Sequence, residues 1–367
     1  MSSPSARPAG RLWDRQVLRL RDCNETARVL VVFAGLAFIS AFLASLAVGS
    51  TGISFGSLPR AIKAAIWETT DVAALRDRLV LLELRLPRTL IGAFTGAALA
   101  VSGAMMQGLF RNPLADPGLI GVSAGAALAA IATIALSDGI LYWWTALLGI
   151  YALPVSAFLG GIVTTLLLVA VAQRTGQVAT ATLLLAGIAF GALAGAVSGL
   201  IAYASDDREL RDLTLWSMGS LTGSSWEKVA AVTPFAILLL ITLPYLVRSL
   251  NGLLLGEAEA FHLGVDVRRA KYLVVATTAA AVGASVAVAG VIGFVGIVVP
   301  HFVRIIAGPD HAVLLPCAAL IGAAVLLFAD VMARMIVAPA ELPIGILMAL
   351  IGAPIFLHLV LRRGVAN

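Results

Sequence analysis

Charged residues are scarce in this chain. Only 12% of its 367 residues are Asp, Glu, Lys or Arg, against ~25% in typical soluble domains. Cysteine is scarcer still, with Cys23 in a polar N-terminal segment and Cys317 in an apolar run. Two cysteines in such different settings indicate neither a disulfide framework nor a metal cluster. This composition excludes an ordinary soluble fold.

The motifs of nucleotide hydrolysis and of common enzymes are also absent. None of the three lysines, Lys63, Lys228 and Lys271, follows a glycine, so there is no GxxxxGK[ST] loop. The four histidines have no metal-ligand spacing, and no HExxH or Ser–His–Asp pattern occurs. We therefore expect no catalytic residue, no metal and no cofactor in this chain, and no ATP hydrolysis by it alone.

Apolar residues dominate instead. They form 60% of the chain, or about 220 side chains, close to the number that ten membrane helices of ~20 residues need. Apolar runs bounded by charges predict an all-α polytopic membrane protein with ten spans. The eighth run is short and contains Pro300, as in a broken or tilted helix. The runs are 28–49, 88–108, 118–136, 147–172, 178–203, 229–247, 272–290, 294–307, 312–332 and 343–361.

The basic residues fit membrane topology better than nucleic-acid binding. They are 22 Arg and 3 Lys, spread along a chain of formal charge +5. With both termini in the cytoplasm, 15 of these 25 residues fall in cytoplasmic segments, in agreement with the positive-inside rule. Residues 1–27 and 364–367 are then cytoplasmic tails around one permease domain at 28–363. The long segment 50–87 is typical of an amphipathic surface helix that meets a partner.

Few ionisable residues lie inside the predicted spans. A charge at mid-bilayer costs ~2.5–3.5 kcal/mol or more, and a proton-driven carrier usually needs such a group. Asp330 and Arg334 are four residues apart, the spacing of an ion pair within one helix. The absence of a buried carboxylate chain argues against secondary transport. Two options remain: a passive pore, or a permease driven by another subunit.

Four glycines recur every fourth residue in the fifth span: Gly187, Gly191, Gly195 and Gly199. Such a stripe lets two helices approach closely, and packing of this kind is the commoner explanation. The alternative is a smooth wall beside a moving substrate. A second series, Gly290, Gly293 and Gly296, precedes Pro300 and predicts a turn between two spans, or a hinge.

The cytoplasmic segment 251–270 separates spans six and seven and is too long for a simple turn. Gly256 and Gly264 bracket a short helical stretch in which acidic residues alternate with apolar ones. A helix lying on the negative inner leaflet is disfavoured by these acidic residues. We therefore expect a compact projection that contacts a cytosolic partner, which favours a permease driven by another subunit.

Several stretches of this chain are similar to one known family. They are RLPRTL (85–90), GAALAVSGAMMQGLFRNPLADPGLIGVSAGA (96–126), LRDLTLWSMGSL (210–221), LGEAEAFHLGV (255–265), GVIGFVGIVVPHFVR (290–304) and ADVMARMIVAPAELPIGILMALIGAPIFL (329–357). In this order, they resemble the FecCD permeases of bacterial type II ABC importers for haem, ferric siderophores and cobalamin. The resemblance covers nearly the whole chain after residue 28.

The resemblance implies an assembly in the bacterial inner membrane. Two copies of this chain form a homodimer, two copies of a cytoplasmic ABC ATPase bind ATP and Mg beneath it, and a periplasmic or lipid-anchored binding protein docks above it. In the family, arginines at the positions of Arg85, Arg88 and Arg334 meet acidic residues of the binding protein. That role competes with a purely internal Asp330–Arg334 pair.

The resemblance also assigns a gate and a coupling segment. Asn112 and Leu114 match the family's cytoplasmic gate after the second span, and Thr180 matches the gate at the start of the fifth. The adjacent family hydroxyl is Ala181 here, which makes this gate less polar. The residues expected to couple to the ATPase are Leu255, Gly256, Glu257, Ala258, Glu259, His262, Leu263 and Gly264.

The expected substrate is haem. LRDLTLWSMGSL, preceded by Asp206, Asp207 and Arg208, is most similar to the haem branch, where arginine near the path meets haem propionates. Ferric siderophore and cobalamin import remain alternatives within the family, and a channel or secondary carrier without an ATPase remains one outside it. The candidate path residues are Arg208, Arg211, Gly187, Gly191, Gly195 and Gly199.

Overall fold

The computed structural model describes residues 10–49, 59, 63, 71–174, 177–338 and 340–364. Most of the predicted amphipathic segment before residue 71 therefore lies outside the described residues, as do the start of the N-terminal tail and residues 365–367. The described chain is helical apart from one two-residue hairpin, in which β1 (Gln173–Arg174) pairs antiparallel with β2 (Gln177–Val178). The all-α prediction is confirmed.

Among the residues that the structure describes, ten apolar helices correspond to the ten predicted runs. Seven are long enough to cross a membrane, and three shorter ones lie in α5, α13 and α15. The longer helices of the first half are α1 (Gly10–Ala47), α4 (Leu86–Phe110), α5 (Val122–Ala135), α7 (Ala152–Ala172) and α8 (Thr180–Ala204). Those of the second half are α10 (Trp226–Leu254), α12 (Val267–Ala289), α13 (Val295–Ala307), α14 (His311–Ile336) and α15 (Ile344–Gly364).

Short elements lie at the ends of these helices. They are α3 (Val72–Leu79), the π-helix η2 (Val80–Arg85), the 3₁₀ helices η3 (Pro117–Ile120) and η4 (Gly149–Tyr151), α6 (Tyr142–Leu148), α9 (Asp207–Ser217) and α11 (Glu257–His262). Both α9 and α12 begin at an aspartate, Asp206 and Asp266, whose side chain accepts from a backbone amide. Such N-caps satisfy amides that the helix itself leaves free.

Several predicted boundaries were wrong. The second span was expected to begin at residue 88, but α3, η2 and α4 form one continuous helix from Val72 to Phe110. The charged residues Arg76, Asp77 and Arg78 lie within this helix, because an apolar run marks only the part of a helix that is suited to the bilayer and not the whole helix. The helix α10 likewise continues to Leu254, beyond the predicted 247, whereas the apolar span of α1, Ala27–Ala47, agrees with the predicted 28–49 although the helix itself begins at Gly10.

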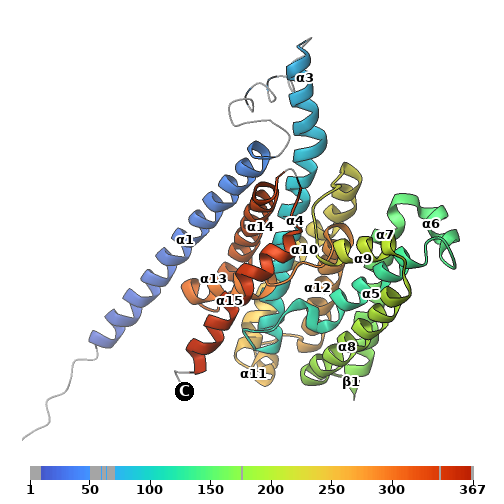
Figure 1. The fold of residues 1–367 in the computed structure, drawn as a ribbon. Helices are drawn as coiled ribbons and strands as arrows, with labels where there is room; N and C mark the ends of the chain where they lie inside the picture. The colour runs from blue at the N-terminus through green and yellow to red at the C-terminus, as the bar shows by residue number, and fades with distance from the viewer. Residues whose placement is uncertain are drawn as a thin grey trace, which may run out of the picture.

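The two ends of the bundle carry different elements (Figure 1). One end, which we call the α11 end, holds the start of α1, the loop after α4, the β hairpin, α11 and the end of α15. The opposite end, which we call the α9 end, holds α3, α6 and α9. Because α1 starts and α15 stops at the α11 end, the arrangement fits an even number of crossings.

The core is built on α4, and close backbone contacts hold its neighbours in place. A Cβ added to Gly96 would lie 2.4 Å from the carbonyl oxygen of Gly322 in α14, and one on Gly103 would lie 1.8 Å from that of Gly296 in α13. Only glycine permits these approaches. By contrast, only 11% of the apolar window of α8 is buried within the chain.

The glycine stripe of α8 is a packing seam at one position only. A Cβ on Gly187 would lie 1.8 Å from the carbonyl oxygen of Leu119 in η3. At Gly191, Gly195 and Gly199 nothing lies within 4 Å of such an atom. Within this chain the stripe packs at Gly187, and the other three glycines face away from the packed helices, so the choice between a packing seam and a wall beside substrate stays a prediction for them.

Candidate functional site

Three arginines from two helices meet at the α9 end, where α1 stops beside α4 and α14. Arg88 donates to both carboxylate oxygens of Asp330, with Nη2 2.8 Å from Oδ1, and to Glu341, with Nη1 2.9 Å from Oε1. Arg334 pairs with the same Asp330, with Nη2 3.0 Å from Oδ2. The carboxylate of Asp330 is fully buried. Because it pairs with both Arg88 and Arg334, it bridges two guanidinium groups.

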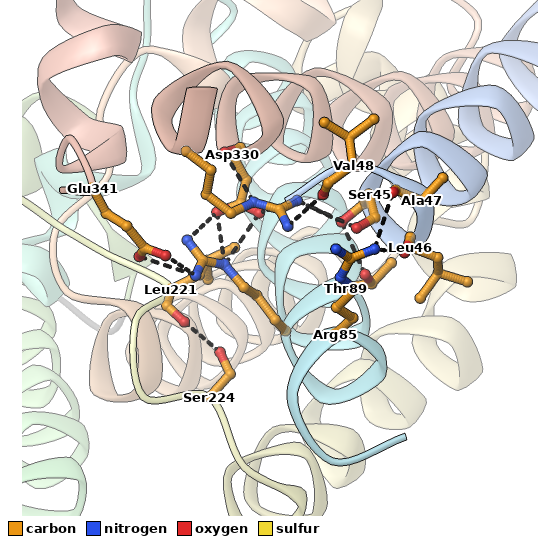
Figure 2. A network of polar contacts seen from close by, with 12 residues as sticks. Ser45, Leu46, Ala47, Val48, Arg85, Thr89, Leu221, Ser224, Asp330 and Glu341 are labelled. Carbon is orange, nitrogen blue, oxygen red and sulfur yellow. Dashed lines mark hydrogen bonds and ion pairs between the residues drawn. The ribbon is translucent and has the colours of Figure 1, made fainter. Parts of the chain in front are cut away.

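The remaining donors of these arginines cap the last turn of α1 (Figure 2). Arg85 donates to the carbonyl oxygens of Leu46 and Ala47 at 2.6 and 3.0 Å, and Arg334 donates to that of Val48 at 2.8 Å. The final carbonyls of a helix have no partner within it and carry partial negative charge. The helix end thus offsets part of the excess positive charge of three arginines over two carboxylates.

Glu341 joins the network to a neighbouring loop. Its Oε2 accepts from Thr222 Oγ1 at 2.6 Å, while both of its oxygens accept from Arg88. Burial works to raise the pKa of Glu341, but the hydrogen bonds from Arg88 and Thr222 outweigh it and hold the pKa below its usual 4.5. The carboxylate is therefore ionised at neutral pH, and it ties the segment before α15 to α4.

These arginines, which the resemblance assigns to contact with a binding protein, are mostly buried within the chain. Arg85 and Arg334 are each 4% exposed, and the side chain of Arg88 is 14% exposed. Arg85 and Arg88 lie on one continuous helix and Arg334 lies on α14, so two elements, and not three, bring these side chains together. The internal Asp330–Arg334 pair is present as well. Docking of a binding protein by these residues stays a prediction, since their charges already have internal partners.

The coupling segment forms a projection at the α11 end. Gly256 and Gly264 lie on either side of α11. Their φ values of 114° and 82° fall in a backbone region that favours glycine. Glu257 pairs with Lys271 of α12, with Nζ 2.8 Å from Oε1. Leu255, Phe261 and Leu263 are each exposed by 65% or more. Large apolar side chains on a polar projection are typical of a protein contact.

The predicted gate residues lie in two segments that start from the same end. Arg111 ends α4 in the left-handed conformation, and Asn112 follows it. The Oδ1 atom of Asn112 accepts a hydrogen bond from the backbone amide of Leu114 at 3.0 Å. Thr180 and Ala181 begin α8. The two segments meet farther along, where Leu119 packs on Gly187. This places the gate loop beside α8 but shows no direct contact between Asn112 and Thr180.

The predicted path residues Arg208 and Arg211 are exposed on α9, at the other end of α8. Arg208 lines a cavity of 450 Å³ together with Asp138, Asp206 and Asp212. Sequence reasoning missed Glu341 and Thr222 altogether. The available signal was that Glu341 is the only acidic residue after Asp330, in an otherwise apolar stretch.

The chain is similar to known proteins over most of its length. The model of the FecCD transport family matches residues 36–362. The hemin transport system permease protein HmuU of Yersinia pestis is 46% identical over 332 residues, 89% of this chain and 95% of that protein. The vitamin B12 import system permease protein BtuC of Escherichia coli is 42% identical over 330 residues, 88% of this chain and 92% of that protein.

Two further relatives extend the comparison. The cobalamin import system permease protein BtuC of Halobacterium salinarum is 45% identical over 282 residues, 77% of this chain and 73% of that protein. A solved structure described as an inward-facing conformation of a metal-chelate type ABC transporter has a TM-score of 0.77 and 33% identity. It covers 91% of this chain and 99% of its own.

Proposed function

Since the chain belongs to the FecCD transport family, whose members are the membrane-embedded permeases of ABC importers, we propose that it carries haem across a bacterial inner membrane. The observation that carries the proposal is the uncovered face of α8. Three glycines of that face have nothing within 4 Å, and the helix contains no charged residue over Thr180–Ala204. Such a face suits a large, flat, mostly apolar cargo.

A second copy of this chain completes the path. The α8 face is too bare to be explained by packing inside one subunit, and a two-fold axis would set the two stripes opposite each other. Cargo then moves between two smooth walls, lined by Gly191, Gly195 and Gly199. The gate loop with Asn112 and Leu114, together with Thr180 and Ala181, closes this path at the α11 end.

Separate chains hydrolyse ATP and deliver the cargo, as in other members of the family. We assign the exposed residues around α11 to contact with an ABC ATPase, which binds ATP and Mg, and place the α11 end and both termini in the cytoplasm. The binding protein docks at the α9 end, where the arginine network stiffens the surface. In this arrangement the permease itself needs no nucleotide site.

Haem is favoured over cobalamin by chemistry at the α9 end. Arg208 and Arg211 are exposed there, beside the end of α8, and their guanidinium groups are suited to pair directly with the two carboxylates of a haem. Cobalamin carries amide side chains instead. The match to a hemin permease over 95% of its length supports the same choice. Cobalamin import is the second candidate, because two BtuC relatives are nearly as similar.

A genetic experiment tests the choice of cargo. Deletion of the gene from its host should abolish growth on haem as the sole iron source and leave cobalamin-dependent growth unchanged. Complementation with the intact gene controls for effects on neighbouring genes. Loss of cobalamin-dependent growth with normal use of haem would replace haem by cobalamin.

A further inference from the structure

A cavity of 570 Å³ lies at the α9 end, next to the arginine network. Its walls come from the starts of α7 and α10, the ends of α9 and α12, and the segments that contain Thr222 and Glu341. Apolar side chains make up much of the lining, among them Leu153, Leu215 and Trp216. Its polar groups are Ser220, Thr222, Lys228 and Glu341. This is the size and composition of a site for a small amphiphilic molecule.

The two charged residues of the cavity differ in how they are compensated. Glu341 forms an ion pair with Arg88 and accepts a hydrogen bond from Thr222. The positive charge of Arg88 therefore compensates its negative charge. The ammonium of Lys228 makes no side-chain hydrogen bond or ion pair with any residue that the structure describes. Because Lys228 is partly buried, its charge carries a desolvation cost with no counter-charge to offset it.

The position of Lys228 is not explained by the stability of its helix. It is the third residue of α10, where the helix end is positive and favours acidic side chains such as Glu227. Lysines near a membrane surface often extend toward lipid headgroups instead. Lys228, however, lines the protein cavity, and its Nζ would be 3.9 Å from a Cβ built on Gly223.

We propose that this cavity is an entry subsite in which Lys228 binds a carboxylate of a porphyrin while Trp216 and the apolar wall contact its ring. The inference rests on the proposed function, because it names the chemistry by which the α9 end receives cargo. The hydroxyl of Ser220 in the same cavity already donates to Thr222 Oγ1, so Lys228 is the group that is left to bind the carboxylate. A porphyrin whose carboxylates are esterified loses this charged contact with Lys228, so the subsite distinguishes a porphyrin diacid from its neutral ester.

The test measures equilibrium binding of protoporphyrin IX and of its dimethyl ester to the permease–ATPase complex in nanodiscs. Metal-free porphyrin excludes binding through iron, and the ester removes both carboxylates without any mutation. The unaltered complex should bind the diacid at least about tenfold more tightly than the ester, as expected for a charge-assisted hydrogen bond. Lys228→Met should abolish this preference, and Lys228→Arg should keep it. Arg76→Met, which removes an exposed charge of α3, is the matched control and should change nothing.

Equal affinity of the unaltered complex for diacid and ester would overturn the proposal, as would an undiminished preference in Lys228→Met. It is also overturned if Lys228→Met weakens only the association of anionic lipid or of the binding protein. Failure of the subsite is distinguishable from failure of the proposed function. A complex that imports haem equally well with Lys228→Met lacks the subsite, whereas one that prefers the diacid yet imports only cobalamin has the subsite without the function.

Discussion

Asp330 and Arg88 form a two-pronged ion pair between residues 242 positions apart in the sequence, with Arg88 Nε and Nη2 3.0 and 2.8 Å from Asp330 Oδ1. The carboxylate is fully buried and also pairs with Arg334. One acidic side chain therefore holds α4 against α14 and, through Arg334, against the end of α1.

Removal of this shared carboxylate should destabilise the protein strongly. Asp330→Asn leaves two guanidinium groups buried without their main counter-charge, and we expect a loss of about 3–5 kcal/mol in the free energy of unfolding. Thermal unfolding of the purified permease in detergent measures it. The control is Arg269→Gln, which breaks the exposed Asp266–Arg269 pair and should cost under about 0.5 kcal/mol. Equal losses in both variants would contradict a structural role for the network.

The stability of the α9 end should depend on pH through Glu341. Its pKa in the folded protein is lower than its usual 4.5, so ionised Glu341 contributes stability that is fully present above about 4.5. That contribution is lost as the pH falls through the lowered value. Glu341→Gln should be less stable than the parent at pH 7, and the gap should close in acid. Thermal midpoints measured from pH 7 downward test this, and a constant gap would contradict it.

The left-handed glycine after α11 should be required for energy coupling. Gly264 has φ 82°, which proline cannot adopt and which costs alanine about 1–2 kcal/mol. Gly264→Pro should abolish transport while the ATPase still assembles and hydrolyses ATP, and Gly264→Ala should have a partial effect. Gly35→Ala, at a position with open space and no unusual φ, is the control. Normal transport by Gly264→Pro would remove α11 from the coupling pathway.

The glycines of α8 should divide into two classes. Gly187→Ala places a Cβ against the carbonyl oxygen of Leu119, so it should destabilise the fold by about 1–3 kcal/mol. Gly195→Leu meets open space, so it should fold normally and yet block transport by filling the path. Thermal unfolding and uptake assays on both variants separate the effects. Full transport by a folded Gly195→Leu would show that this face contacts lipid and not cargo.

Hydropathy alone predicted the ten apolar helices, because burial in lipid leaves a long, local signal in the sequence. The Asp330–Arg334 pair was also predictable, since its partners are one helical turn apart. The contact of Asp330 with Arg88 was not, because nothing local links residues so far apart in sequence. For the same reason, spacing grouped Gly187 with Gly191, Gly195 and Gly199, although only the tertiary fold brings Leu119 to the first of them.

The most direct test of the account is cargo uptake by the assembled importer in proteoliposomes. The permease, the ATPase and the binding protein encoded with it are reconstituted together, and the initial rates of uptake of labelled haem and labelled cobalamin are compared with and without ATP. The account predicts ATP-dependent accumulation of haem, none of cobalamin, and none of either when the ATPase is omitted. Haem accumulation without the ATPase, or accumulation of cobalamin alone, would contradict it.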